Sequence, residues 1–273
     1  MASPNYEQIQ SFGAVSEQLR AAALDEFAEY LYEGITQAEV IDVAVGVAQK
    51  YSMLGSELGA QWYDLCSQLA GLDVEPAELS TSTIDTLDAR AGAFAEAVDA
   101  AATESLQAAF NGWLQNEINN SIRVTGSANL WRDYERGKAP GKWARVPVGD
   151  TCAWCLMLAS QGAWYLSEES ALGKESGHYH DACNCIAVYH ADAESISGYS
   201  KLDEYKSMYY DAENLRMANR DPYNDYEYPE ELQDRITRAK AAHIAKYEAD
   251  ETDKKWTVYN EDLIIMRYKY GLK

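Results

Sequence analysis

Long apolar runs are absent from this 273-residue chain. The best candidate for a membrane segment, VAVGVA at 43–48, is far shorter than the roughly 18 apolar residues that cross a bilayer. The start, MASPNYEQIQ, has neither the basic region nor the apolar core of a secretory signal peptide. We therefore expect a protein that does not contact a membrane and is kept in a reducing cytoplasm. In that compartment, clustered cysteines favour metal binding over disulfides.

Basic residues are scarce in the first part of the chain. The net charge is -21, and residues 1–110 hold 3 basic against 18 acidic residues. Such a surface repels nucleic acids and anionic membranes, because their phosphate groups carry the same sign of charge. We therefore expect a partner that presents basic patches.

One local basic segment, residues 123–145, interrupts this acidity. It contains Arg123, Arg132, Arg136, Lys138, Lys142 and Arg145, with Trp131, Tyr134 and Trp143 interleaved. The segment could contact nucleic acid, although a solvated face at the end of a helix is the simpler interpretation. The Gly-Lys pair at 141–142 is not part of a phosphate-binding loop, because Trp143 stands where that motif requires Ser or Thr.

Residues 36–70 carry the clearest helical pattern. Apolar side chains recur there every three or four positions, as one buried helix face requires. Thr36 and Glu39 have the spacing of a capping box at the start of this helix. Glycine weakens a helix, so glycines inside it indicate close packing against a neighbouring helix. The three glycines are Gly46, Gly55 and Gly59.

A second apolar stripe, at 84–113, predicts another long helix, and 121–136 predicts a third that ends at GKAPGK. We expect an acidic helical bundle over 1–120, with a core-facing stripe on each helix and an outer face able to dock a partner. A helix and basic linker over 121–143 would follow it.

From residue 144 the pattern changes to short extended pieces. ARVPV, GAWYL and CIAVYHA predict strands around a cysteine motif within 144–195. The segment 196–273 is rich in tyrosine and poor in aliphatic residues. Residues 230–249 have a helical pattern, and the last twenty residues fit either a helix or a strand. The expected fold is mainly α: an N-terminal helical bundle, a small α+β domain stapled by zinc, and an extended or helical C-terminal tail that wraps over its neighbours.

The cysteine motif is Cys152-x2-Cys155, followed after 24 residues by His180-x2-Cys183-x-Cys185. Two short chelating turns joined by a longer excursion suit a tetrahedral structural zinc site. At most four of these five side chains can bind one tetrahedral ion. We expect Cys152, Cys155 and His180 as ligands, with either Cys183 or Cys185 as the fourth.

Other chemistry fits the pattern less well. A Cys-His hydrolase needs one thiolate and one histidine, so two chelating pairs are surplus to it. A zinc deaminase needs an H-x-E motif before its cysteine pair, which is missing here. We assign no site role to the remaining cysteine and histidines; Cys66 is expected to be a small buried apolar residue. The histidines are His178, His190 and His243.

The run ARVPVGDTCAWCLMLASQGAWYLSEESA, followed by YHDACNC, resembles the minor capsid or head morphogenesis proteins of tailed bacteriophages, the Mu F-like family, in its actinobacterial phage and prophage form. KYSMLGSELGAQWYDL at 50–65 is similar to the helical front of these proteins. Asn184 departs from the pattern, because a basic residue is frequent at that position. The matching residues are Arg145, Val146, Pro147, Gly149, Cys152, Cys155, Met157, Leu158, Ala159, Ser160, Gly162, Ala163, Tyr165, His180, Cys183 and Cys185.

The resemblance implies a virion protein of few copies that lies in the phage head near the portal and acts in head assembly or in DNA packaging and delivery. Its partners would be the portal protein and other head proteins, and the 123–145 segment could contact the packaged DNA. No catalytic constellation is convincing, so we do not expect an enzyme. The alternatives are a zinc-dependent hydrolase or nuclease-type effector delivered with the phage genome, and a zinc-knuckle nucleic-acid binder.

Overall fold

The computed structural model describes residues 2–98, 103–148, 152–162, 185–191, 196–247 and 256–272. The contacts divide the chain into two compact units. Unit 1 comprises Met1–Val148 and Ala163–Tyr199, and unit 2 comprises Gly149–Gly162 and Ser200–Lys273. Helices dominate both units, which confirms a mainly α fold. None of the described helices is both long enough and apolar enough to cross a membrane.

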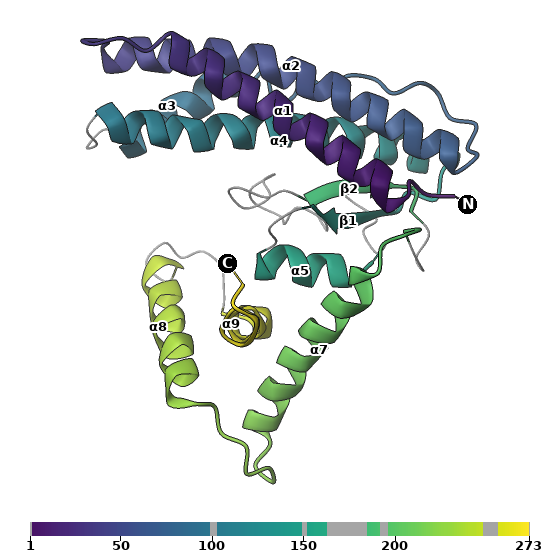
Figure 1. Ribbon diagram of the computed structural model, residues 1–273, viewed down its shortest axis with the longest axis vertical. Helices are drawn as coiled ribbons and strands as arrows, with labels where there is room; N and C mark the ends of the chain where they lie inside the picture. Colours follow the sequence, from purple (N-terminus) through teal and green to yellow (C-terminus); the bar gives the residue numbers. More distant parts are fainter. Residues whose placement is uncertain are drawn as a thin grey trace. The chain divides into compact units, whose positions relative to one another are not determined.

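Unit 1 is built on long helices (Figure 1). Helices α2 and α4 pack along one another, and α1 packs on both, while α3 lies against α2. The capping box predicted at Thr36 and Glu39 is present, with the side chain of each residue bonded to the backbone N–H of the other. Asn5 and Gln8 form a second box at the start of α1. The helices are α1 (Tyr6–Glu29), α2 (Gln37–Leu69), α3 (Leu87–Val98) and α4 (Thr103–Glu135).

Glycines bring the axes of α2 and α4 close together. A Cβ on Gly59 would overlap the Ile122 carbonyl, and a Cβ on Gly55 would lie 3.1 Å from the Ile118 carbonyl oxygen. The prediction of close packing is therefore confirmed at both positions. It is wrong at Gly46, where a Cβ would meet nothing within 4 Å, because this glycine lies on an exposed face of α2.

Helix α4 differs from the sequence prediction. The pattern indicated one helix over 84–113 and another over 121–136, whereas α4 runs unbroken from Thr103 to Glu135. Residues 117–123 are all buried, although most of them are polar. Because other elements surround α4 here, none of its faces is exposed to solvent over these residues. The alternation of apolar and polar residues that marks a surface helix is therefore lost.

Two short strands complete the described part of unit 1. β1 (Trp143–Pro147) pairs antiparallel with β2 (Cys185–Tyr189), with Trp143 opposite Tyr189 and Pro147 opposite Cys185. This pairing confirms the strands predicted from ARVPV and CIAVYHA; the predicted strand GAWYL lies outside the described residues apart from Gly162. β2 contacts α1, α2 and α4. The Trp62 indole N–H donates to the Ala187 carbonyl oxygen at 2.5 Å and so ties α2 to β2.

Unit 2 consists of helices, with α9 at its centre in contact with the other three. A buried ion pair joins α7 to α9, since Arg216 Nε lies 2.6 Å from Asp262 Oδ1. The helix predicted at 230–249 is confirmed, and the ambiguous C-terminal segment is a helix. The elements are α5 (Ala153–Ser160), α7 (Lys201–Arg220), α8 (Glu230–Tyr247) and α9 (Val258–Tyr270).

Candidate functional site

The first cysteine pair lies at the start of a helix. Cys152 is the N-cap of α5, and the Cys155 backbone N–H donates to Cys152 Sγ over 3.3 Å. Cys155 is buried and Cys152 half-buried. The sequence predicted a tight turn at Cys152 and Cys155, and in the structure these residues instead begin the helix α5. The run AWCLMLAS is buried on most sides and continues as α-helix, and the cysteine side chain takes the capping place of a Ser or Asp.

The second half of the motif is described only at its end. Cys185 is buried and begins β2. His178, His180 and Cys183 lie outside the described residues. Cys185 belongs to unit 1, and Cys152 and Cys155 to unit 2. Within the described part of the chain, no three His, Cys, Asp or Glu side chains gather as a metal site would require, so zinc binding stays a prediction.

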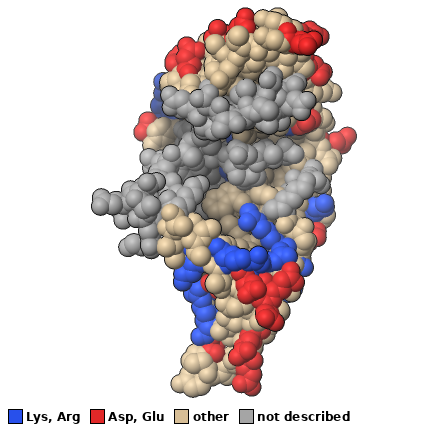
Figure 2. Space-filling model, turned by 90° about the vertical axis from the view of Figure 1, so that its left-hand side faces the viewer, with Lys and Arg blue, Asp and Glu red and all other residues tan. Residues whose placement is uncertain are grey.

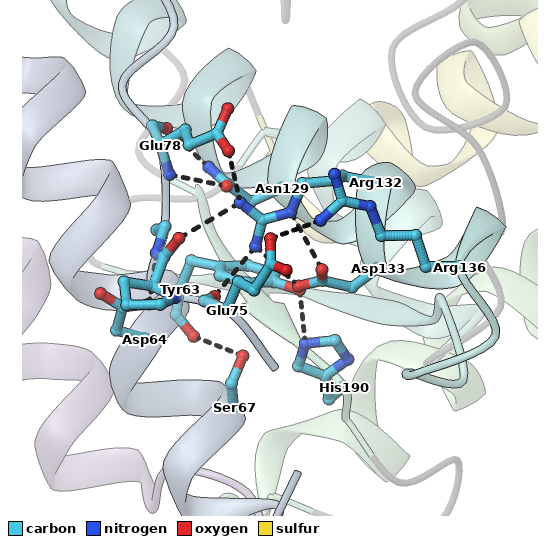
Figure 3. A network of polar contacts seen from close by, with 12 residues as sticks. Tyr63, Asp64, Ser67, Glu75, Glu78, Asn129, Arg132, Asp133, Arg136 and His190 are labelled. Carbon is cyan, nitrogen blue, oxygen red and sulfur yellow. Dashed lines mark hydrogen bonds and ion pairs between the residues drawn. The ribbon is translucent and has the colours of Figure 1, made fainter. Parts of the chain in front are cut away.

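A buried polar cluster lies instead at the meeting point of α2, α4 and β2 (Figure 3). The Tyr63 hydroxyl donates to Asp133 Oδ2 at 2.7 Å and lies 3.0 Å from His190 Nε2. Because the hydroxyl proton is directed to Asp133, His190 Nε2 must carry the proton of the second bond. His190 Nδ1 then presents a bare lone pair, and it has no hydrogen-bond partner among the described residues.

Arg132 fastens this cluster to the loop between α2 and α3. Its Nε and one terminal nitrogen donate to the two oxygens of Asp133 at 2.9 and 3.0 Å. The terminal nitrogens also donate to the backbone carbonyls of Glu75 at 3.0 Å and Pro76 at 3.2 Å. Asn129, one turn earlier on α4, accepts from the Glu78 N–H and donates to the Glu78 carbonyl. The loop thus lies fixed along α4 (Figure 3).

Burial sets the protonation states of the cluster. It lowers the pKa of His190 to about 4, an effect that the nearby Asp133 charge only partly opposes. Burial also raises the pKa of the Tyr63 hydroxyl, as does its bond to Asp133. Burial alone would raise the pKa of Asp133, but the bonds from Arg132 and Tyr63 lower it. At neutral pH the cluster therefore holds an ionised Asp133, a neutral His190 and a protonated Tyr63.

The cluster is built for structure rather than turnover. Tyr63, Asp133 and His190 each have a relative exposure of 0%. A substrate has no route to atoms that are closed off in this way, whereas buried hydrogen bonds rigidify the elements that they join. Sequence reasoning missed it. Asp133 follows Leu130 by three positions on one face of α4, and a carboxylate on an apolar face was the signal that could have found it.

Most of the arginines in the basic segment 123–145 are buried or paired with carboxylates of the same chain. Arg123 and Arg145 are buried. Arg132 is paired with Asp133, and Arg136 with Glu75 at 2.5 Å. The exposed groups are Arg136, Lys138, Lys142, Trp131 and Tyr134, and the rings of Trp131 and Tyr134 have centroids 5.5 Å apart.

The helical front, residues 1–110, has far too few basic residues to neutralise its 18 acidic residues. The three basic residues before position 111 all pair inside unit 1: Arg20 with Glu17, Lys50 with Glu26, and Arg90 with Glu117. Apart from Glu26, the described carboxylates in this part of the chain are exposed, and Figure 2 shows red side chains over the visible end of these helices, at the top of the view. The described surface of this part of the chain is therefore strongly acidic.

The family described as VG15 protein matches residues 4–212. The chain belongs to the VG15 protein family. One similar relative is the Gene 15 protein of Mycobacterium phage D29, with 32% identity over an alignment that covers 26% of this chain and 35% of that protein. The chain thus spans about a third of the length of the curated relative that it matches. No solved structure matches the chain. The VG15 match and the mycobacteriophage relative together indicate a phage protein.

Proposed function

We propose that this VG15 protein is a minor capsid protein of a tailed phage, one that associates with the portal and acts in head morphogenesis or in DNA packaging and delivery. The observation that carries the proposal is the family match over residues 4–212 together with the mycobacteriophage relative. The Mu F-like resemblance of the cysteine motif, from Arg145 to Cys185, supports the head and portal assignment.

The geometry supports an assembly role. The polar cluster of Tyr63, Asp133 and His190 is sealed from solvent and joins α2, α4 and the end of β2. Residues 1–110 hold 18 acidic and 3 basic residues, and all three basic residues are already in ion pairs. A rigid body with a strongly acidic face can dock on a basic partner without any reaction step, and opposite charges steer the two together.

We propose zinc as a structural ion of the cysteine motif. The position of Cys152 and Cys155 supports this proposal. Both residues lie at the first turn of α5, and Cys152 caps the helix. A helix N-terminus favours the thiolate, the form that binds zinc. His180 and either Cys183 or Cys185 would complete the tetrahedron. Zinc would supply folding energy there rather than chemistry.

Purified heads test the assignment. Quantitative mass spectrometry of phage heads and mature virions should find the chain in few copies per particle, in a fixed ratio to the portal. Heads assembled without the chain should fail in packaging or in DNA delivery, while the major shell still forms. A chain absent from both particles would contradict the proposal.

A further inference from the structure

A groove runs between α1 and α2 on the surface of unit 1. Its volume is about 520 Å³, within the range of small binding sites in proteins. It is open along one side, and both of its walls are helices. The lining residues are Glu7, Gln8, Ser11, Phe12, Val15, Leu58, Gln61, Trp62 and Leu65.

The floor of the groove is apolar and fixed in position. Phe12 and Trp62 stack with ring centroids 4.3 Å apart. The bond from the Trp62 indole to the Ala187 carbonyl holds the ring in place. Val15, which is 47% exposed, and Leu58, which is half-buried, also line the groove and add accessible apolar surface to it. Because the floor is pre-formed, a ligand would bind without first ordering it.

The rim of the groove carries negative charge. Glu7 lines the opening on α1, and Glu57 is exposed on α2 beside Leu58. No basic residue is among the lining residues. The nearest cations in sequence, Arg20 and Lys50, are engaged with Glu17 and Glu26. A segment that offered apolar groups to the floor and cations to the rim would match both features.

We propose that the α1–α2 groove docks an amphipathic helix of the partner, with apolar side chains at positions i, i+3 or i+4, and i+7, flanked by lysine or arginine. A helix laid in a groove between two helices presents its anchors at this spacing. The inference rests on the proposed function in one respect: the helix would belong to the portal or another head protein.

A designed peptide tests the groove directly. The probe is a fluorescent 18-residue helix of leucine and lysine, with leucines at the stated spacing, titrated onto the full chain and followed by anisotropy. A peptide of the same composition with its leucines scrambled is the reference probe. We expect the patterned helix to bind at least tenfold more tightly than the scrambled one.

Two variants separate docking from simple charge attraction. Val15→Glu and Leu58→Glu each add a negative charge, which would strengthen attraction to lysine, but they remove the apolar contact. We expect each to weaken binding about tenfold or more. Met217→Glu is the matched control, because Met217 is a comparably exposed helical residue outside the groove, and it should bind as the wild type does. Circular dichroism melts check that all three variants fold.

The peptide titration and incorporation into heads test the groove and the proposed function separately. Equal binding of the two peptides, or wild-type affinity of both groove variants, would overturn the groove proposal. Incorporation into heads is measured separately. If the wild type enters heads and both groove variants enter at the same level, the groove proposal fails and the proposed function stands. If the wild type is absent from heads, the proposed function fails, and the peptide titration still decides the groove.

Discussion

Tyr63 and His190, 127 positions apart in the chain, meet with Oη and Nε2 separated by 3.0 Å. The contact joins α2 to the end of β2, and Asp133 of α4 accepts the Tyr63 proton on its other side. All three side chains are buried, so their bonds have no competition from water. The single hydroxyl of Tyr63 therefore bonds to two other elements at once, and its removal would leave a buried group on each of them short of a partner.

Tyr63→Phe should destabilise the protein. The substitution keeps the ring but leaves Asp133 Oδ2 and His190 Nε2 each short of one partner, which costs about 1–3 kcal/mol in the free energy of unfolding. Urea unfolding measures the change. Tyr32→Phe is the control, because Tyr32 bonds to Glu39 at the exposed surface, and it should alter stability by less than about 0.5 kcal/mol. Equal effects of the two substitutions would refute the role given to Tyr63.

Stability should rise with pH between about 4 and 6.5 because of His190. Burial lowers the pKa of His190 to about 4 from the model-compound value of 6.5, so the unfolded chain binds more protons in this window. The contribution is fully present above pH 6.5 and is lost as the pH falls to 4. Its total size is roughly 3 kcal/mol.

His190→Asn isolates this effect. Asparagine tolerates the positive backbone angle at this position, where φ is 55°, and it does not titrate. The difference in the free energy of unfolding between wild type and variant should therefore widen from pH 4 to 6.5. Parallel curves for the two proteins would show that His190 is not the group responsible.

Gly59→Ala and Gly46→Ala should have opposite effects although both change α2. A methyl group at Gly59 would overlap the Ile122 carbonyl and force α2 and α4 apart, at a cost of about 1–3 kcal/mol. Nothing lies within 4 Å of a Cβ at Gly46, so alanine there should stabilise the helix by up to about 1 kcal/mol. Thermal unfolding of both variants checks the sign of each change. Similar melting temperatures would contradict the close approach at Gly59.

Metal analysis tests the zinc proposal. Protein purified without chelator should contain one zinc ion per chain, and Cys152→Ser and His180→Ala should each lower that content. Cys66→Ala should retain it, because Cys66 is a buried residue of α2 whose thiol pKa burial raises to about 12, which disfavours the thiolate that binds metal. Wild-type protein that carries no zinc after expression in zinc-supplemented medium would contradict the proposal.

Features set by nearby residues could be predicted from the sequence. The capping box at Thr36 needs only a glutamate three positions later, and the strands around the motif follow from short β-rich runs. α4 could not be predicted as one helix, because its buried middle is polar and takes its partners from distant elements. The Cys152-x2-Cys155 spacing indicated a turn, but the apolar run after Cys152 favours a helix that this cysteine caps.

The partners that meet in the buried cluster could not be predicted from the sequence. Nothing in the neighbourhood of His190 or Asp133 marks them as partners, because what joins them is a tyrosine on another helix. The spacing of Gly55 and Gly59 did indicate a close helix contact, but the same argument failed at Gly46, since a sequence does not say which face of a helix is covered. Both the buried cluster and the contacts of the α2 glycines depend on packing between segments far apart in the sequence.

Carbodiimide cross-linking of purified heads tests the central claim most directly, because it joins carboxylates to lysines that touch them. The helical front holds 18 acidic residues in positions 1–110, so its docking on a basic surface should give several cross-links. We predict links from carboxylates of α1 and α2, Glu7 and Glu57 among them, to lysines of the portal protein. Links to the portal only from unit 2, or heads that lack the chain, would contradict the account.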